Sequence, residues 1–247
     1  MSTERVRILG VPVDVVTSSQ VLDIIQTLVR ERVPRQLVTV NPEFIMAAQT
    51  NPEFRGVLNR AALALPDGVG VLWAGRVHGR RLPERVSGSD IVPRIAERAA
   101  AEGWRLYFLG ADPGVAAEAA RRLMDRYDGL SVVGTYSGSP SSEEEQHIVQ
   151  LVGAGRPDIL LVAYGAPAQD TWIARNMQRL DVPVCMGVGG TFDFIAGNRR
   201  RAPLWIQRLG LEWLHRLVRE PWRWRRQLAL PRFAFAVLEE RLRRGYG

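Results

Sequence analysis

The sequence predicts an α/β fold: a mostly parallel sheet with helices on both faces, of the Rossmann-like kind, followed by a helical C-terminal appendage. From Trp104 onward, short continuous apolar runs alternate with helix-like stretches, which is typical of a parallel sheet covered on both sides. A chain of 247 residues that is 46% hydrophobic can bury a sizeable core. This length suits either one large α/β domain or two small ones.

Apolar runs in the second part of the chain define the expected strands, which are 105–110, 130–136, 158–165 and 183–190. Strands in the first hundred residues are less regular and are expected near "RVRILGV", "QLVTVN" and "AALALPDG". The helices expected there are 18–32, 42–60, 69–77 and 89–102. Ser18 and Ser89 are the candidate N-caps. We divide the chain into an α/β body, 1–198, and a basic, Trp-rich helical appendage, 199–247.

Charge is distributed unevenly along the chain. All 33 basic residues are arginine, so an isolated arginine carries little information, and the net charge is +7. Residues 199–247 hold 13 Arg against four Glu, a net charge of +9, whereas residues 1–198 hold 20 Arg against 22 acidic residues, a net charge of −2. The body is therefore almost neutral and the C-terminal segment is strongly basic.

The basic segment is also rich in tryptophan, with four of the chain's seven at Trp205, Trp213, Trp222 and Trp224. Aromatic and basic side chains together suit an anionic membrane surface, where rings enter the interface and cations meet lipid headgroups. Two alternatives stay open for this segment. It is either a set of terminal helices packed on the body or a tail that binds nucleic acid.

The cysteine and histidine content and the hydropathy of the chain indicate the cellular compartment of the protein. A single cysteine and three histidines form no disulfide framework and no zinc-type cluster. The N-terminus carries charges that interrupt any signal-peptide core, and no uncharged apolar run reaches the length of about 18 residues that a spanning helix needs. We expect a cytoplasmic protein that is peripheral on the inner face of the cell membrane.

Glycine-rich loops follow several expected strands, where α/β folds bind ligands. Such loops let a backbone approach a phosphate, and the free N–H groups of the next helix can bind its oxygens. The alternative is a tight strand-to-helix turn with no ligand. No G-x-G-x-x-G opens a helix after the first strand, and there is no P-loop motif. The nucleotide-binding candidates at these strand ends are Gly110, Tyr136, Gly187, Gly189, Gly190 and Asp193.

Polar residues at the same strand ends are the candidates for catalysis. Asp67 follows an apolar run, where partial burial would raise its pKa and suit it to act as a general base, although Pro-Asp-Gly is often only a turn. Arg85 and Asp90 lie in "RVSGSD", which would otherwise be a solvated helix start. Thr39, Asn41 and Gln169 are placed to read sugar hydroxyls. Since no D-x-D motif exists, we expect no metal and no cofactor.

Five stretches together resemble one known family: "TVNPEF", "LPDGVGVLWAG", "ERVSGSD", "GAPAQDTWI" and the long run from "GVGGTFDFIAGNRRRAPLW" into "LEWLHRLVREPWRW". In this order they resemble the WecG/TagA/CpsF glycosyltransferases of bacterial cell-surface polymer synthesis. The resemblance implies transfer of a sugar, typically N-acetylmannosamine, from a UDP donor to an undecaprenyl-diphosphate-linked acceptor. Where many members have a lysine before the glutamine, this chain has Ala168.

The family's functional residues carry over by motif. Its base falls on Asp67, and its substrate-reading residues fall on Thr39, Asn41, Arg85 and Gln169. Its appended arginines, expected to face the nucleotide diphosphate, fall on Arg216, Arg223 and Arg226.

The leading hypothesis is therefore an inverting, metal-independent glycosyltransferase. Its partners would be a UDP-sugar, a polyprenyl-diphosphate-linked GlcNAc-type acceptor and an anionic membrane, and not nucleic acid. The sequence leaves open whether the protein is a monomer or a homo-oligomer. One alternative is a nucleotide-sugar-modifying enzyme with a soluble product, and the other is a nucleic-acid binding module driven by the basic tail.

Overall fold

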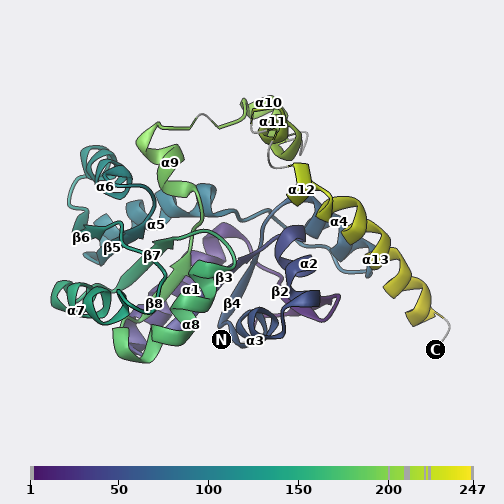
Figure 1. The fold of residues 1–247 in the computed structure, drawn as a ribbon, viewed down its shortest axis with the longest axis horizontal. Helices are drawn as coiled ribbons and strands as arrows, with labels where there is room; N and C mark the ends of the chain where they lie inside the picture. Colours follow the sequence, from purple (N-terminus) through teal and green to yellow (C-terminus); the bar gives the residue numbers. More distant parts are fainter. Residues whose placement is uncertain (1–2, 200, 209–211, 220, 222–223, 246–247) are drawn as a thin grey trace.

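The computed structural model describes residues 3–199, 201–208, 212–219, 221 and 224–245 (Figure 1). A six-stranded, all-parallel sheet in the order β4-β3-β8-β7-β5-β6 forms its centre. The strands of this sheet are β3 (Arg35–Val40), β4 (Leu63–Pro66), β5 (Arg105–Gly110), β6 (Ser131–Tyr136), β7 (Ile159–Ala163) and β8 (Val184–Gly187). The predicted α/β class is confirmed.

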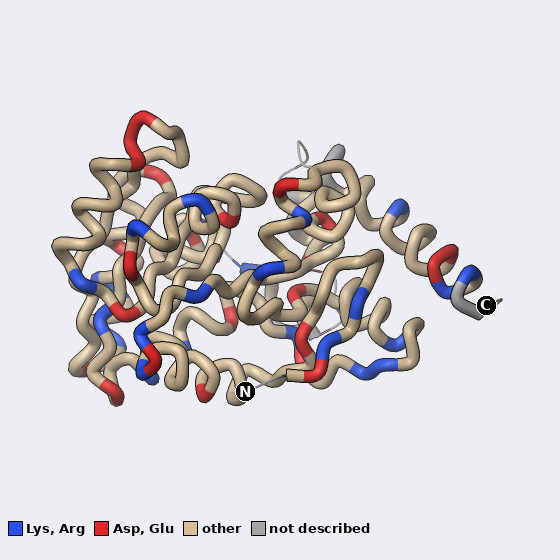
Figure 2. Tube along the Cα trace, turned by 90° about the horizontal axis from the view of Figure 1, so that it is seen from below, with Lys and Arg blue, Asp and Glu red and all other residues tan. Residues whose placement is uncertain are grey.

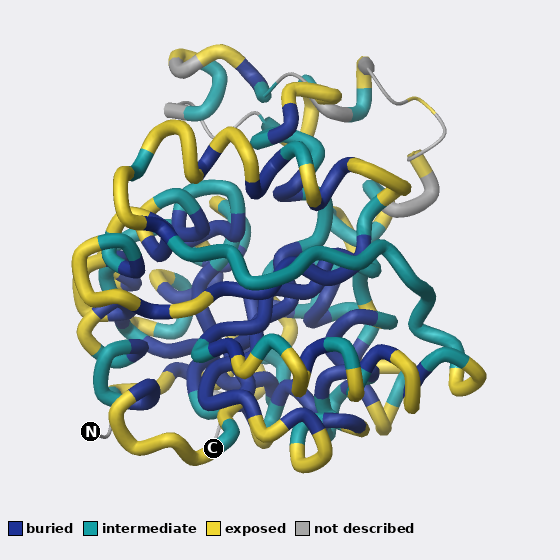
Figure 3. The backbone as a smooth tube through the Cα atoms, turned by 90° about the vertical axis from the view of Figure 1, so that its left-hand side faces the viewer, coloured by how far each residue is buried: buried dark blue, intermediate teal, exposed yellow. Residues whose placement is uncertain are grey.

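Helices cover both faces of the sheet, and the buried strands run between them (Figure 3). On one face lie α1 (Ser18–Glu31), α5 (Gly88–Glu102), α6 (Val115–Arg126) and α9 (Thr191–Ala196). On the other face lie α2 (Pro42–Thr50), α3 (Pro52–Arg60), α7 (Glu145–Gly155) and α8 (Ala168–Leu180), with α4 (Val69–Val77) beside α2. Alternate strand residues divide between the faces: Leu37 packs toward the first and Val38 toward the second.

The first predicted strand, "RVRILGV", is instead two strands. β1 (Arg5–Ile8) and β2 (Val11–Asp14) pair antiparallel as a separate hairpin. The chain turns at Leu9 and Gly10, whose φ angles are 49° and 78°. This two-residue, left-handed turn matches the twist of paired antiparallel strands, so the run folds back on itself rather than joining the parallel sheet.

The predicted helix 42–60 is interrupted. Asn51 ends α2, and its side chain accepts a hydrogen bond from the Phe54 N–H to begin α3. Pro52 follows, and a proline both lacks an N–H and disfavours helical geometry in the residue before it. The predicted caps also shift: Thr17 rather than Ser18 caps α1, and Ser87 rather than Ser89 stands at the N-cap of α5.

After α9 the chain runs to α10 (Leu204–Arg208) and α11 (Glu212–Arg219), and then returns through α12 (Trp224–Gln227) to α13 (Ala229–Gly245) (Figure 1). α13 lies against α2 and α4, and its Phe233 and Val237 are buried in the same cluster as the residues of those helices. The last helix of the predicted appendage is thus packed on the body. It carries both basic and acidic residues (Figure 2).

Candidate active site

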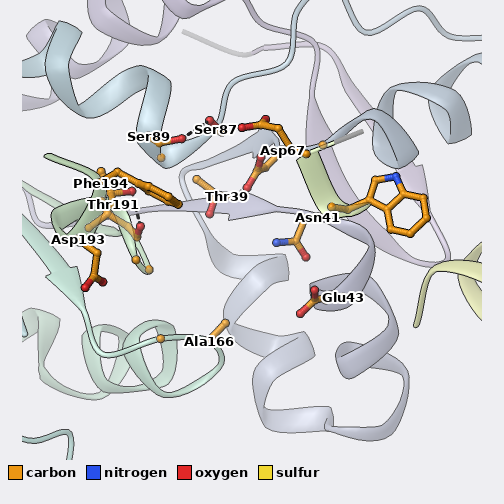
Figure 4. Close-up of a pocket in the computed structure, with 18 of the residues that line it drawn as sticks. Thr39, Asn41, Glu43, Asp67, Ser87, Ser89, Ala166, Thr191, Asp193 and Phe194 are labelled. Carbon is orange, nitrogen blue, oxygen red and sulfur yellow. Dashed lines mark hydrogen bonds between the residues drawn. The ribbon is translucent and has the colours of Figure 1, made fainter. Parts of the chain in front are cut away.

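A cavity of about 890 Å³ opens at the carboxyl end of the sheet. The loops after β3, β4, β7 and β8 line it, together with the start of α5, the segment after α9, and α11. The five predicted catalytic residues all line this cavity: Thr39, Asn41, Asp67, Arg85 and Gln169. Figure 4 shows Asp67 next to Thr39, with Asn41 nearby.

Backbone geometry holds Asp67 at the end of β4. Its N–H donates to the Val40 carbonyl oxygen at 2.8 Å, and the Val86 N–H donates to the Pro66 carbonyl oxygen at 2.8 Å. The next residue, Gly68, has a φ of 96°, a conformation that side chains disfavour. The Pro-Asp-Gly sequence is therefore a turn, and the turn carries its carboxylate into the cavity.

Burial raises the pKa of Asp67 from 3.8 to about 7. The positive charges of Arg85 and Arg201 oppose the shift, and the negative charges of Asp90 and Glu212 add to it. No side chain in the described part of the chain donates a hydrogen bond to this carboxylate. A carboxylate that gains a proton near neutral pH has the proton affinity that a general base requires.

Asn41 and Thr39 come from the end of β3. The Asn41 side-chain oxygen accepts a hydrogen bond from the Phe44 N–H at 2.9 Å and so caps α2. With its oxygen held in this way, the amide NH₂ group is fixed in direction at the cavity wall. Thr39 is buried, and its side chain lies beside Asp67 (Figure 4).

Gln169 supports the glycine-rich loop after β8. Its side chain is buried, and its oxygen accepts a hydrogen bond from the Gly189 N–H at 2.9 Å. Phe192 of α9 stacks on Phe108 of β5 with 4.7 Å between ring centroids, which anchors the loop from its other end. Gly189 and Gly190 are thereby held against the cavity.

The predicted nucleotide-binding residues separate into two groups. Gly189, Gly190 and Asp193 line the cavity, and Asp193 pairs with Arg199 at 3.7 Å. The other three lie outside its lining, and they are Gly110, Tyr136 and Gly187.

Close packing accounts for the two glycines outside the lining. A Cβ atom at Gly110 would come within 2.8 Å of the Ala163 carbonyl carbon, and one at Gly187 within 2.7 Å of an Asp170 carboxylate oxygen. Tyr136 packs its ring edge-on against His147, 5.6 Å between centroids. A glycine at a strand end can therefore be required for strand packing as well as for the approach of a ligand. The nucleotide-binding role of Gly110, Gly187 and Tyr136 stays a prediction.

The predicted arginines of the appendage are not placed by the structure. Arg223 lies outside the described residues, as do the side chains of Arg216 and Arg226. The backbone of Arg216 lies in α11, and that of Arg226 lies in α12. α11 itself borders the cavity through Glu212, Trp213 and His215.

The sequence did not predict an ion ring, of which three residues line the same cavity as Asp67: Arg85, Arg201 and Glu212. Arg85 pairs with Asp90 at 3.2 Å and with Glu212. Arg201 completes the ring through Asp90 at 2.7 Å and Glu212 at 3.1 Å. Sequence reasoning missed Arg201 and Glu212 as site residues because they lie 116 and 127 positions after Arg85 in the chain. The signal that could have found Arg201 was the run of three consecutive arginines to which it belongs.

The arginines of the ring favour the charged form of Asp90. Burial opposes ionisation of Asp90, but hydrogen bonds from Arg201 and Ser87 and the charges of Arg201 and Arg85 outweigh it and lower the Asp90 pKa. Two of each charge sit in alternation, so the ring is neutral as a whole.

Two further properties concern the described residues alone. No three His, Cys, Asp or Glu side chains among them gather into a group that would hold a metal ion. None of the helices built from these residues has both the length and the apolar character needed to span a bilayer.

Comparison with known proteins identifies relatives. The model of the glycosyl transferase WecG/TagA/CpsF family matches residues 6–246. An N-acetylglucosaminyldiphosphoundecaprenol N-acetyl-beta-D-mannosaminyltransferase of Bacillus spizizenii is 35% identical over 203 residues, 82% of this chain and 78% of the relative. The protein of the same name from Bacillus subtilis is 32% identical over 210 residues, 85% of this chain and 81% of the relative. The chain therefore belongs to the WecG/TagA/CpsF family and is a glycosyltransferase.

Proposed function

We propose that this enzyme transfers an N-acetylmannosamine-type sugar from a UDP-sugar to a polyprenyl-diphosphate-linked GlcNAc acceptor, with inversion at the anomeric carbon. The names of both Bacillus relatives describe this acceptor and this transferred sugar. The observation that carries the mechanism is Asp67 in the cavity, with its pKa raised by burial to about 7.

In the proposed reaction, the acceptor hydroxyl oxygen attacks the anomeric carbon of the donor. The bond from that carbon to the diphosphate oxygen breaks, the hydroxyl proton passes to Asp67, and UDP leaves with the bonding electrons. Thr39 and Asn41 would orient sugar hydroxyls beside the base, since both line the same wall.

The developing charge on UDP needs cations or amide N–H groups close by. Arg199 and Arg201 line the cavity, and so do Gly189 and Gly190 of the loop after β8. We propose that these groups, with Arg216, Arg223 and Arg226, take the place of a metal ion, and that the reaction uses no cofactor.

Membrane association belongs to the same proposal, because the acceptor carries a polyprenyl chain. Large apolar side chains on the C-terminal helices are exposed, among them Trp205 at 63% and Trp224 at 54%. With the +9 charge of residues 199–247, they suit a peripheral site on the inner face of the cell membrane. Binding to anionic vesicles that weakens as salt rises would support this, and equal binding to neutral vesicles would contradict it.

The test of the reaction combines a panel of UDP-sugars with a soluble GlcNAc-diphospholipid analogue. UDP release and product mass are measured, with and without EDTA. We expect product to depend on the acceptor and to survive EDTA. Asp67→Asn should lower turnover by about two to four orders of magnitude, the effect of losing a general base, while UDP binding persists. Turnover of a UDP-sugar with no acceptor present would favour the nucleotide-sugar-modifying alternative.

A further inference from the structure

Asp170, in the first turn of α8, is an acidic side chain enclosed in the core. It has no exposed surface, and neither of its carboxyl oxygens forms a hydrogen bond of good geometry with any residue that the structure describes. Burial raises the pKa of this carboxyl from 3.8 to about 7, and the neighbouring Gln169 side chain opposes the shift. An acid buried without an ion pair costs folding free energy, so its place in the core calls for a role other than stabilisation.

The Asp170 carboxyl lies beside Gly187, the last residue of β8. A Cβ atom at Gly187 would stand 2.7 Å from the Asp170 Oδ1 atom and 2.5 Å from the Gln169 Nε2 atom. The φ angle of Gly187 is not positive, so the glycine is required by the space and not by the backbone. An acid oxygen and an amide nitrogen therefore meet where the side chain of residue 187 would otherwise be.

The Gln169 amide has one favoured orientation between its two neighbours. Its oxygen accepts the hydrogen bond from the Gly189 N–H at 2.9 Å, and its Nε2 atom lies on the side of Gly187 and Asp170. If the amide were turned over, its NH₂ group would face the Gly189 N–H, donor against donor. An acceptor at position 170 thus favours the orientation that ties the loop after β8.

The turn that carries Asp170 is fixed to the sheet. The Asp170 carbonyl oxygen accepts a hydrogen bond from the Nε2 atom of Gln36, a buried residue of β3, at 3.0 Å. The Gln169 N–H donates to the Gly165 carbonyl oxygen at 2.8 Å. The sheet therefore sets the position of the acid, and Gln169 passes that position on to Gly189, which lines the cavity.

We propose that Asp170 is a positioning residue that holds the Gln169 amide in the orientation that ties down the loop after β8. Asp170 itself does not line the cavity, so it acts through Gln169 and not on a substrate. Gly187 supplies the space in which the two side chains meet. The consequence for catalysis rests on the proposed function: the loop at Gly189 is held where the diphosphate of the donor would bind.

Amide hydrogen exchange at Gly189, followed by NMR in the free protein, tests the tie without any substrate. Asp170→Ala removes the acceptor and Gly187→Ala displaces both polar groups, so each should speed up this exchange about two- to tenfold, the effect of losing one hydrogen bond. Asp170→Asn keeps an acceptor oxygen and should stay within about twofold of the wild type. Asp125→Ala is the matched control, because it removes an exposed aspartate that pairs with Arg121 on α6.

Either of two exchange results would overturn the proposal. One is unchanged exchange at Gly189 in Asp170→Ala, and the other is equal acceleration in Asp170→Ala and Asp170→Asn. If Asp170→Ala does not fold, the comparison of Asp170→Asn with Gly187→Ala decides the question: fast exchange in Gly187→Ala alone supports the tie, and fast exchange in both contradicts it.

The transferase assay gives the kinetic counterpart. Asp170→Ala should raise the KM for the UDP-sugar about two- to tenfold and leave the KM for the soluble acceptor analogue unchanged. If both KM values rose alike, the substitution would have loosened the whole site, and the proposal would fail. If the wild type transfers no sugar, the proposed function fails, whereas the exchange at Gly189 still decides whether Asp170 holds the loop.

Discussion

Helices α11 and α13 both belong to the basic C-terminal segment, but different forces hold them. α13 buries Phe233 and Val237 between α2 and α4, and its Glu240 accepts a hydrogen bond from the Leu9 N–H at 2.9 Å and meets His78. α11 is tied to the body by Glu212 in the ion ring, and its Leu214 and Val218 are exposed.

The difference indicates how each helix should respond to salt and to charged ligands. Charge screening weakens apolar contacts far less than ion pairs, and α13 packs on the body through its buried Phe233 and Val237. An ion ring beside the proposed diphosphate site is open to competition from the ligand's own charge. The ion pairs of Glu212 are therefore the attachment of α11 that salt and charged ligands can weaken, whereas the burial of Phe233 and Val237 holds α13.

The largest effect on stability should follow from removing an apolar side chain that packs α13 on the body. Phe233→Ala removes a large side chain that is 2% exposed, and it should cost about 3–5 kcal/mol of unfolding free energy in urea. Glu212→Gln should cost about 1 kcal/mol or less, because the ring is partly solvated. Glu239→Gln, on the exposed side of α13, is the control and should change stability by less than about 0.5 kcal/mol. Equal losses for Phe233→Ala and Glu212→Gln would remove the distinction.

Sequence reasoning located the residues of the cavity because parallel strands end at one edge, so Asp67, Thr39 and Gln169 had to converge. It could not predict the ring. Glu212 and Arg85 meet only because the segment after α9 crosses to α11, and no local pattern encodes that path. The basic charge of the segment also concealed that its one acid in α11 makes the contact.

The N-cap preference predicted the wrong residue at the start of α5, where two nearby serines could take the N-cap position. Ser87 stands at the N-cap of α5 instead of the predicted Ser89, and the Ser87 hydroxyl donates to the Asp90 carboxylate at 2.6 Å. Gly88 lies between them and must approach Thr191, since a Cβ there would come within 2.9 Å of the Thr191 hydroxyl. Packing between α5 and α9 thus decides the helix start, and that information is tertiary.

The second prediction tests whether burial of the Asp67 carboxyl lowers the stability of the folded protein. The pKa of Asp67 is about 7 in the folded protein and near 3.8 when unfolded. As pH rises through this interval the unfolded chain loses the proton first, so wild-type stability falls. Asp67→Asn has no such proton to lose. The free energy of unfolding of the variant should exceed that of the wild type by about 1–2 kcal/mol at pH 8. This difference is smaller than full burial would give because the Asp67 side chain is partly exposed, and it should vanish near pH 4. A gain that is the same at both pH values would contradict the burial of an ionising group.

The smallest effect should come from salt, and it tests the two helices within one molecule. Raising NaCl from about 0.1 M to 1 M shortens the screening length from about 10 Å to 3 Å, which weakens the partly exposed ring and leaves apolar contacts intact. Amide hydrogen exchange in α11 should therefore speed up about two- to threefold, while exchange in the buried turn of α13 around Val237 stays constant. Glu212→Gln should already exchange faster at low salt and respond less to added salt, because its ring is open from the start. If salt accelerated α13 as much as α11, both helices would be held by charge, and α13 could no longer be assigned to the body on the strength of Phe233 and Val237.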